Sequence, residues 1–185
     1  MSRRLLLIVL ALATLGLSAC GNKETTVHNG ESEAEYVTLG EMQYQVQLSR
    51  LLNAYNPGDR SLLIGVPPAL RGLGRGNVWF GVWVRVFNHS ERLQLGADSF
   101  KIVDTRGREY EPVPLTAQNA FAYRAVAVQR ESTYPVLDSA AGNSPTVGSL
   151  LLFKLPEATL DFRPLELEFS SSVLPGRTST IRLDV

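Results

Sequence analysis

The first residue with chemical potential is Cys20, the only cysteine in a chain of 185 residues. A thiol can form a disulfide, act as a nucleophile, bind a metal or carry a lipid. A single cysteine excludes an intramolecular disulfide. Cys20 lies at a border, because the residues before it are apolar and the string Gly21–Thr26 after it is polar. Its role therefore depends on what the preceding segment is.

The segment before Cys20 has the three parts of a secretory signal. Arg3 and Arg4 supply the positive start, residues 5–17 form the apolar middle, and residues 18–19 are small. A membrane-spanning helix needs about 20 apolar residues, and this run is shorter. We therefore interpret residues 1–19 as a cleaved signal peptide.

The tetrad Leu17-Ser18-Ala19-Cys20 resembles the bacterial lipobox, in which a leucine and two small residues precede an invariant cysteine. This resemblance implies a lipoprotein whose Cys20 carries a diacylglycerol, palmitate for example, and forms the mature N-terminus. Two or three acyl chains hold a protein stably to a bilayer. We expect a location at the cell membrane, lipid-anchored on the extracytoplasmic face. The alternatives are a secreted protein with an incidental cysteine and an uncleaved signal anchor.

Other side chains with catalytic potential occur in isolation. His28 has no second metal ligand at a useful spacing, and His89 stands in a polar turn after an apolar segment. Ser99 and Lys101 have a Ser-x-Lys spacing, which the polar face of a strand also produces. The Gly-x-Ser-x-Gly and His-Glu-x-x-His motifs do not occur. We therefore expect no enzyme, no cofactor and no metal site.

Arg71 and Arg75 lie in a glycine-rich stretch, residues 67–76. Phosphate-binding loops of this composition stand between a strand and a helix, whose N-terminus points at the anion. Here the segment that follows has the pattern of a long strand, so a nucleotide site is not expected. We predict a mobile loop whose exposed arginines bind an anionic partner, either a wall polymer or an acidic surface of another envelope protein.

The charge balance argues against nucleic acid as a partner. Removing residues 1–19 takes away two of the eighteen basic residues and none of the eighteen acidic ones, which leaves a formal charge of −2. A nearly neutral chain has no general attraction to polyanions. The remaining length suits one domain with an adequate core.

Residues 20–40 are rich in Glu, Thr, Asn and Gly and have no sustained apolar period. Such composition is typical of disorder. We therefore predict a lipidated, disordered tether over residues 20–40 and a folded domain over residues 41–185.

The predicted domain has the pattern of β-strands. Residues 42–48 alternate apolar residues with glutamine, and residues 77–89 are apolar on both faces, which is typical of a central strand. A single helical turn is predicted at residues 156–162. Further strands are predicted over residues 62–66, 100–102, 108–113, 123–129, 148–154, 165–169 and 181–185.

Three of these segments resemble the immunoglobulin-like domains of unknown function that follow lipobox signals in Gram-positive, especially actinobacterial, proteins. They are WFGVWVRVFNHSERL, SFKIVDTRGREYEPV and GSLLLFKLP. The strand pattern alone predicts a two-layer sandwich. With the resemblance, the expected fold class is all-β, an immunoglobulin-like antiparallel β-sandwich preceded by a signal peptide and a disordered tether.

Phe121 and Tyr123 lie between predicted strands. They either seal one end of the sandwich or form an exposed aromatic patch that binds a partner. We expect a non-enzymatic binding or structural module of the cell envelope, or alternatively an accessory or ligand-carrier lipoprotein that assists an envelope enzyme or transporter. A deep apolar pocket between the sheets would favour the carrier, and a flat apolar patch on the strand edges or end loops would favour the binding module. A pocket that combines His89 with a carboxylate and a hydroxyl would favour an enzyme.

Overall fold

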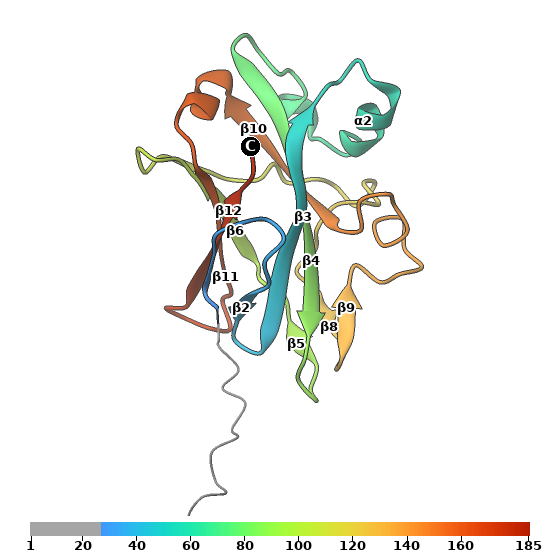
Figure 1. Ribbon diagram of the computed structural model, residues 1–185. Helices are drawn as coiled ribbons and strands as arrows, with labels where there is room; N and C mark the ends of the chain where they lie inside the picture. Colours follow the sequence, from blue (N-terminus) through green and yellow to red (C-terminus); the bar gives the residue numbers. More distant parts are fainter. Residues whose placement is uncertain (1–26) are drawn as a thin grey trace, which may run out of the picture.

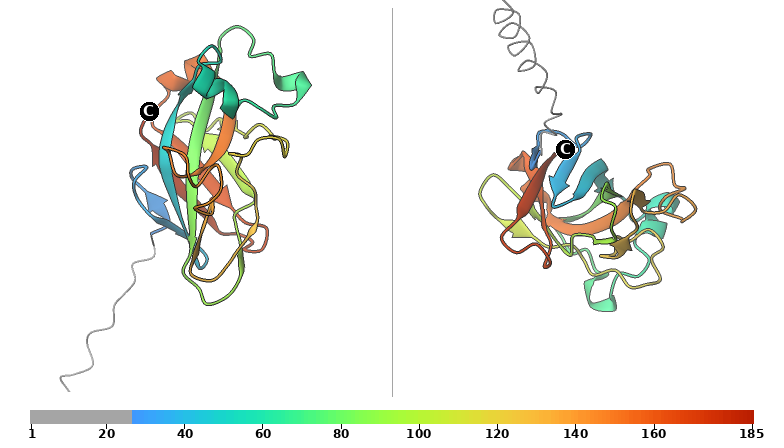
Figure 2. Two further views of the ribbon diagram at one scale, coloured as in Figure 1. Left: turned by 90° about the vertical axis from the view of Figure 1, so that its right-hand side faces the viewer. Right: turned by 90° about the horizontal axis from the view of Figure 1, so that it is seen from below.

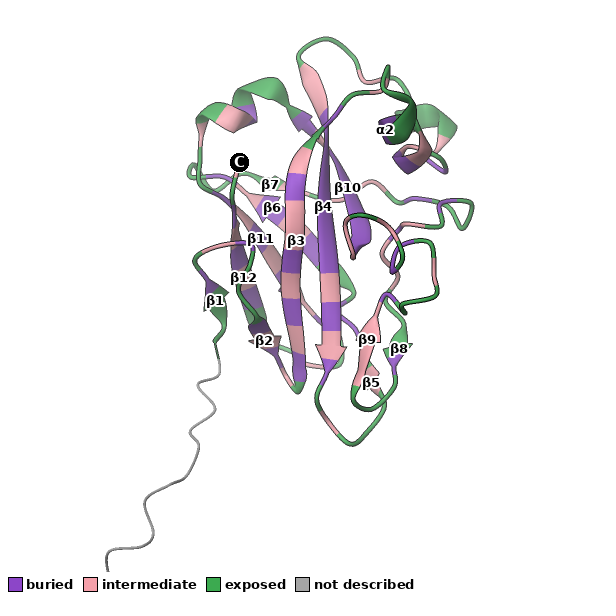
Figure 3. Ribbon diagram, turned by 45° about the vertical axis from the view of Figure 1, so that its right-hand side comes forward, coloured by how far each residue is buried: buried purple, intermediate pink, exposed green. Residues whose placement is uncertain are grey.

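The longest alternating segment of the sequence forms the centre of the molecule. In the computed structural model, which describes residues 27–185, β4 (Asn77–Asn88) lies between β3 (Met42–Leu52) and β10 (Ser149–Pro156). Both neighbours are antiparallel to it. From Met42 to Val46 the apolar residues of β3 are buried and the glutamines between them are half-buried, as the alternating colours in Figure 3 show. The predicted period of two is confirmed over these residues. It ends at an irregularity between Val46 and Leu48, after which Leu48 is half-buried and packs with the cluster on the opposite face.

Two sheets pack face to face, and the predicted antiparallel β-sandwich is confirmed (Figure 1). The first sheet has the order β10-β4-β3-β2, with β9 paired to the end of β4, and the second has the order β1-β12-β11-β6-β7. Among the described strands only β1 and β12 pair in parallel. The remaining strands, including the separate β5-β8 pair, are β1 (Asn29–Gly30), β2 (Val37–Leu39), β5 (Gln94–Leu95), β6 (Ser99–Val103), β7 (Glu109–Tyr110), β8 (Ala127–Val128), β9 (Ser132–Tyr134), β11 (Leu165–Ser170) and β12 (Thr178–Leu183).

The first sheet is covered on both faces. Val82 and Val84 of β4 are fully buried against the second sheet. On the opposite face Trp79 and Trp83 pack with Leu62 and other apolar side chains into a second cluster. β4 is therefore the doubly covered central strand that its sequence predicts.

Residues 62–66 do not form the predicted strand. They end the helix α2 (Pro57–Leu62) and continue as a turn. The side chain of Asn56 accepts a hydrogen bond from the Gly58 N–H, and proline occupies the first helical position, which together start a helix. A short apolar run cannot by itself distinguish a strand from a buried helical segment.

One further predicted strand is shorter than expected, and the predicted helical turn is present. The strand predicted over residues 123–129 is reduced to the two residues of β8. A helical turn does occupy the expected place after β10, as the 3₁₀ helix η3 (Glu157–Asp161). A second such turn, η2 (Pro68–Leu70), lies in the connection between β3 and β4.

The predicted disordered tether is wrong for residues 29–39. β1 pairs with β12, and β2 pairs with β3. Between them the buried carboxylate of Glu33 accepts hydrogen bonds from the Ser49 N–H and the Asp184 N–H, each at 3.0 Å. Backbone pairing and one buried carboxylate keep this polar segment ordered. Neither interaction requires apolar residues at regular spacing, so the sequence pattern did not indicate it. Cys20, the signal peptide and the first part of the tether lie outside the described residues.

The sandwich has two distinct ends, separated by the length of β3 and β4 (Figure 2). The proximal end holds Val27 together with residues 39–42, 89–95 and 171–178. The distal end holds the connection from β3 to β4, residues 53–76, which includes α2. Twelve residues in β4, at about 3.3 Å each, place the ends roughly 35–40 Å apart.

Candidate functional site

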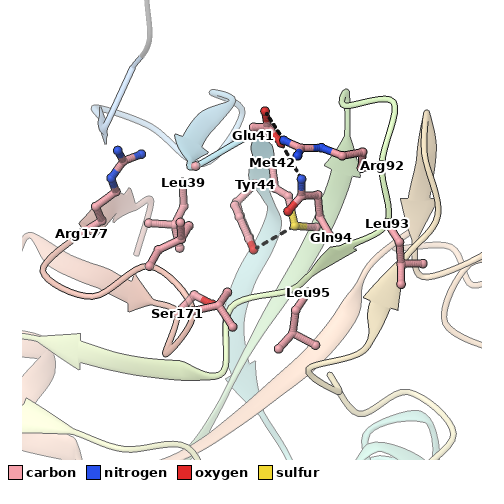
Figure 4. A pocket seen from close by; sticks show the side chains of 13 residues that line it. Leu39, Glu41, Met42, Tyr44, Arg92, Leu93, Gln94, Leu95, Ser171 and Arg177 are labelled. Carbon is pink, nitrogen blue, oxygen red and sulfur yellow. Dashed lines mark hydrogen bonds and ion pairs between the residues drawn. The ribbon is translucent and has the colours of Figure 1, made fainter.

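An open groove lies at the proximal end, between the edges of the two sheets, and is called the end groove (Figure 4). Its volume of about 490 Å³ is within the range of small-molecule sites. Three separate parts of the chain build it, namely the turn from β2 to β3, the loop around β5 and the turn from β11 to β12. Its lining residues are Leu39, Gly40, Glu41, Met42, Tyr44, Arg92, Leu93, Gln94, Leu95, Ser171, Val173, Leu174 and Arg177.

Gly40 closes the turn that forms one wall of the end groove. Its φ of +66° lies in the left-handed region, where only glycine is free of strain. A Cβ atom at this position would stand 2.6 Å from the Cδ1 atom of Leu174 on the opposite wall. The positive φ therefore favours glycine here, and a larger residue would also have to displace the Leu174 side chain.

Asn88, at the end of β4, fixes the loop that carries Arg92 and Leu93. Its buried side-chain amide donates to the carbonyl oxygens of Arg92, Val128 and Gln129 at 2.7, 3.0 and 3.1 Å. Its side-chain oxygen accepts from the Ser90 N–H at 2.9 Å. One side chain thus joins β4, the β5 loop and β8.

Tyr44 forms the buried floor of the end groove. Its hydroxyl accepts a hydrogen bond from the Ala97 N–H at 2.8 Å and lies 3.9 Å from the sulfur of Met42. Burial raises the pKa of Tyr44 to about 12. The phenol therefore stays protonated and neutral at physiological pH, and its hydrogen bond to the Ala97 N–H ties β3 to the segment before β6.

The rim of the end groove combines polar and apolar side chains. Glu41 pairs with Arg92 at 3.3 Å and accepts a hydrogen bond from Gln94, as the dashed lines in Figure 4 show. The hydroxyl of Ser171 is buried and has no hydrogen-bond partner within residues 27–185. Such a site can hold a molecule or surface that is apolar with a polar head.

Arg71 and Arg75 lie at the distal end, away from the end groove. Both are exposed, and neither forms an ion pair with another described residue. The loop is held by hydrogen bonds from the Arg71 Nε–H to the Val66 carbonyl and from Lys154 Nζ to the Gly72 carbonyl. Binding of an anionic partner by these arginines remains a prediction.

Phe121 and Tyr123 pack inside the molecule. Phe121 is half-buried against the apolar cluster on the outer face of the first sheet. The Tyr123 ring packs edge-on against Phe100, its hydroxyl donates to the Ala97 carbonyl at 3.0 Å, and burial raises its pKa well above the usual value. The structure therefore gives these two half-buried rings packing contacts, and partner binding by them stays a prediction.

His89 is exposed after β4, as expected. Its Nε2 lies 2.6 Å from the Oε1 atom of Gln43, and its ring packs edge-on against Phe87. The shallow hollow around it is lined by Tyr36, Gln43, Arg85, Val86, Phe87 and Thr133, a set without a carboxylate. The combination of histidine, carboxylate and hydroxyl that would favour an enzyme does not form in this hollow.

Residues 27–185 contain no group of three or more His, Cys, Asp or Glu side chains arranged to hold a metal ion. Within the same range no helix has the length and apolar character that crossing a membrane requires.

The fold and the end groove define the class as an antiparallel β-sandwich protein. No family model matches the chain, and no curated protein matches its sequence. Solved structures resemble this chain only weakly. An uncharacterised β-sandwich protein of Clostridium difficile 630 has a TM-score of 0.43 and 11% identity, over 84% of this chain and 95% of that one.

Two proteins of Bacillus subtilis have similar TM-scores and sequence identities to this chain. The yjhA protein has a TM-score of 0.49 and 10% identity, over 83% of this chain and 99% of that one. The "putative lipoprotein" ycdA has a TM-score of 0.48 and 11% identity, over 83% of this chain and 39% of that one. The sandwich is assigned from the strand pairing above, independently of these likenesses.

Proposed function

We propose that this protein is a lipid-anchored, extracytoplasmic, non-enzymatic binding or structural module of a bacterial cell envelope. In this proposal the lipobox places a diacylglycerol on Cys20, and the sandwich is an immunoglobulin-like domain of the kind found in Gram-positive lipoproteins. The proposal names no cofactor and no nucleic-acid partner.

The observation that carries the proposal is the position of Val27. It is the first described residue, its carbonyl accepts a hydrogen bond from the Thr38 N–H at 2.6 Å, and it lies at the proximal end. Only six residues separate it from Cys20, and the seven steps from Cys20 to Val27 reach at most about 25 Å. A lipid on Cys20 would therefore keep the proximal end next to the membrane and turn the distal end outward.

The distal end suits contact with an envelope partner. The connection of residues 53–76 carries three exposed arginines, Arg60, Arg71 and Arg75, while its single acidic residue, Asp59, is buried and paired with Arg50 at 2.7 Å. Exposed arginines favour an anionic partner. One exposed carboxylate, Glu157, stands beside this connection, since its N–H donates to the Gly76 carbonyl. A wall polymer or an acidic protein surface fits this description.

A ligand-carrying accessory lipoprotein is the second candidate function. The end groove, with its mixed polar and apolar lining and the buried Ser171 hydroxyl, favours it. The groove is open along one side, whereas a carrier usually encloses most of its ligand. This openness favours the binding module over the carrier.

The lipid anchor is tested by Cys20→Ala in cells that express the full chain. We expect complete loss of radiolabelled palmitate from the protein, with accumulation of precursor or release of the chain from the membrane fraction. Ser18→Ala, which keeps a small residue in the lipobox, is the control and should still be labelled. Equal labelling of the Cys20→Ala variant and the wild type would place the anchor elsewhere.

A further inference from the structure

Exposed aliphatic side chains gather at the rim of the end groove. Leu93 and Val173 are each 56% exposed, and Leu95 is 39% exposed. They come from two loops that are far apart in sequence but border one groove. Single exposed apolar residues are ordinary, whereas a group around one hollow marks an interaction surface.

Two arginines stand beside these aliphatic residues. Arg92 is exposed and pairs with Glu41 at 3.3 Å. A surface ion pair of this kind is weak, so another anion can displace Glu41 from Arg92. Arg177 is exposed and forms no ion pair within residues 27–185. Arginine binds phosphate oxygens well, and its long side chain can reach them from an apolar surface.

The reach of the N-terminal segment selects the occupant of this surface. If Cys20 is lipidated, Val27 lies at most about 25 Å from the bilayer. The distal end cannot then lie face down on the membrane, because Val27 would stand roughly 35–40 Å above it. The proximal end is the part of the domain that can meet lipid.

We infer that the proximal end is a membrane-docking surface, an inference that rests on the proposed lipid anchor. Leu93 and Val173 insert into the interfacial region of the bilayer, and Arg92 and Arg177 meet lipid phosphates. Glu41 and Glu91 on the same end keep its charge balanced. Docking therefore depends mainly on the aliphatic side chains and changes little with salt.

The experiment uses a chain from Gly21 to Val185, which contains every described strand and both apolar clusters and has no cysteine. An N-terminal polyhistidine tag holds it on vesicles of phosphatidylglycerol and phosphatidylcholine doped with a nickel-chelating lipid. The single substitution Leu93→Cys carries an environment-sensitive NBD dye. We expect a blue shift, a gain in intensity and quenching by a bilayer-embedded quencher when the protein is tethered.

The matched control is Leu137→Cys with the same dye. Leu137 is 67% exposed and lies in the loop between β9 and β10, at the side of the sandwich. Its dye should keep the emission of the free protein. Adding Val173→Glu to the Leu93→Cys chain should remove most of the blue shift, because a charge at this rim opposes insertion.

The outcomes distinguish docking of the proximal end on the bilayer from lipid anchoring at Cys20. Unchanged emission at position 93 overturns the docking surface, whatever the state of Cys20. A shift of equal size at positions 93 and 137 also overturns it, since it would show unspecific adsorption. A shift at position 93 alone supports docking even if palmitate labelling of Cys20 fails, because the tag replaces the lipid in this experiment.

Discussion

Val84→Asp should unfold the domain. Val84 is fully buried at the middle of β4 and faces the second sheet, so the new carboxylate would have neither water nor a partner. Burial of an unpaired charge costs several kcal/mol, here about 4 kcal/mol or more. Because domains of this size are stable by only about 5–15 kcal/mol, much or all of the stability is lost. Urea unfolding followed by tryptophan fluorescence measures the change.

Val136→Asp is the matched control for this substitution. Val136 is 53% exposed in the loop between β9 and β10, and the same change there should alter the free energy of unfolding by no more than about 0.5 kcal/mol. Equal stability of the two variants would mean that residue 84 does not face the core and that the register of β4 is wrong.

Asn88→Ala should give the second largest loss. Removal of the amide takes a donor from the carbonyl oxygens of Val128 and Gln129, about forty residues away, and leaves the Arg92 carbonyl with only the Ser90 hydroxyl. Each unsatisfied buried group costs about 1–3 kcal/mol, so we expect a loss of about 3 kcal/mol. Hydrogen exchange should rise first in residues 89–95 and 127–129, because Asn88 holds them to β4.

Asn143→Ala tests whether the effect is specific to Asn88. Asn143 is exposed, and its backbone N–H, which donates to the Ser139 carbonyl, survives the change. The free energy of unfolding of the Asn143→Ala variant should match that of the wild type. Unchanged exchange in residues 89–95 of the Asn88→Ala variant would show that the loop is held by other contacts.

The central strands and the turn after β6 are predictable from sequence because their signals are local. Alternation along β3 and β4 follows from the direction in which successive side chains point. The turn at residues 104–107 is set by one side chain, since Asp104 accepts hydrogen bonds from the N–H groups of Arg106 and Arg108. Burial alone would raise the pKa of the Asp104 carboxyl. The hydrogen bonds from these N–H groups and from the Arg106 guanidinium outweigh burial and lower the pKa to about 2.

The end groove is not predictable from sequence in the same way. Its walls come from residues 39–42, 92–95 and 171–177, which the topology brings together and no spacing connects. Leu93 and Val173 are single apolar residues in polar loops, a pattern without a local signal. Phe121 and Tyr123 could not be assigned from sequence for a similar reason, because rings in a long irregular segment can pack under it as readily as they can face a partner.

The order of residues 29–39 was also missed, for a physical reason. Composition measures how much apolar surface a segment can bury, and this one has little. Its order comes instead from edge pairing of β1 and β2 and from Glu33, whose carboxylate bonds to two distant parts of the backbone. The segment between Cys20 and the domain is therefore shorter than predicted, and under the proposed lipidation it would hold the proximal end nearer to the membrane.

The most direct test of the lipid anchor is mass spectrometry of the N-terminal peptide of protein extracted from the membrane fraction. The account predicts a peptide that begins at Cys20 and carries the added mass of a diacylglycerol, with or without a further acyl chain on its amine. A mature chain that begins at any other residue, or an unmodified Cys20 in membrane-bound protein, would contradict it.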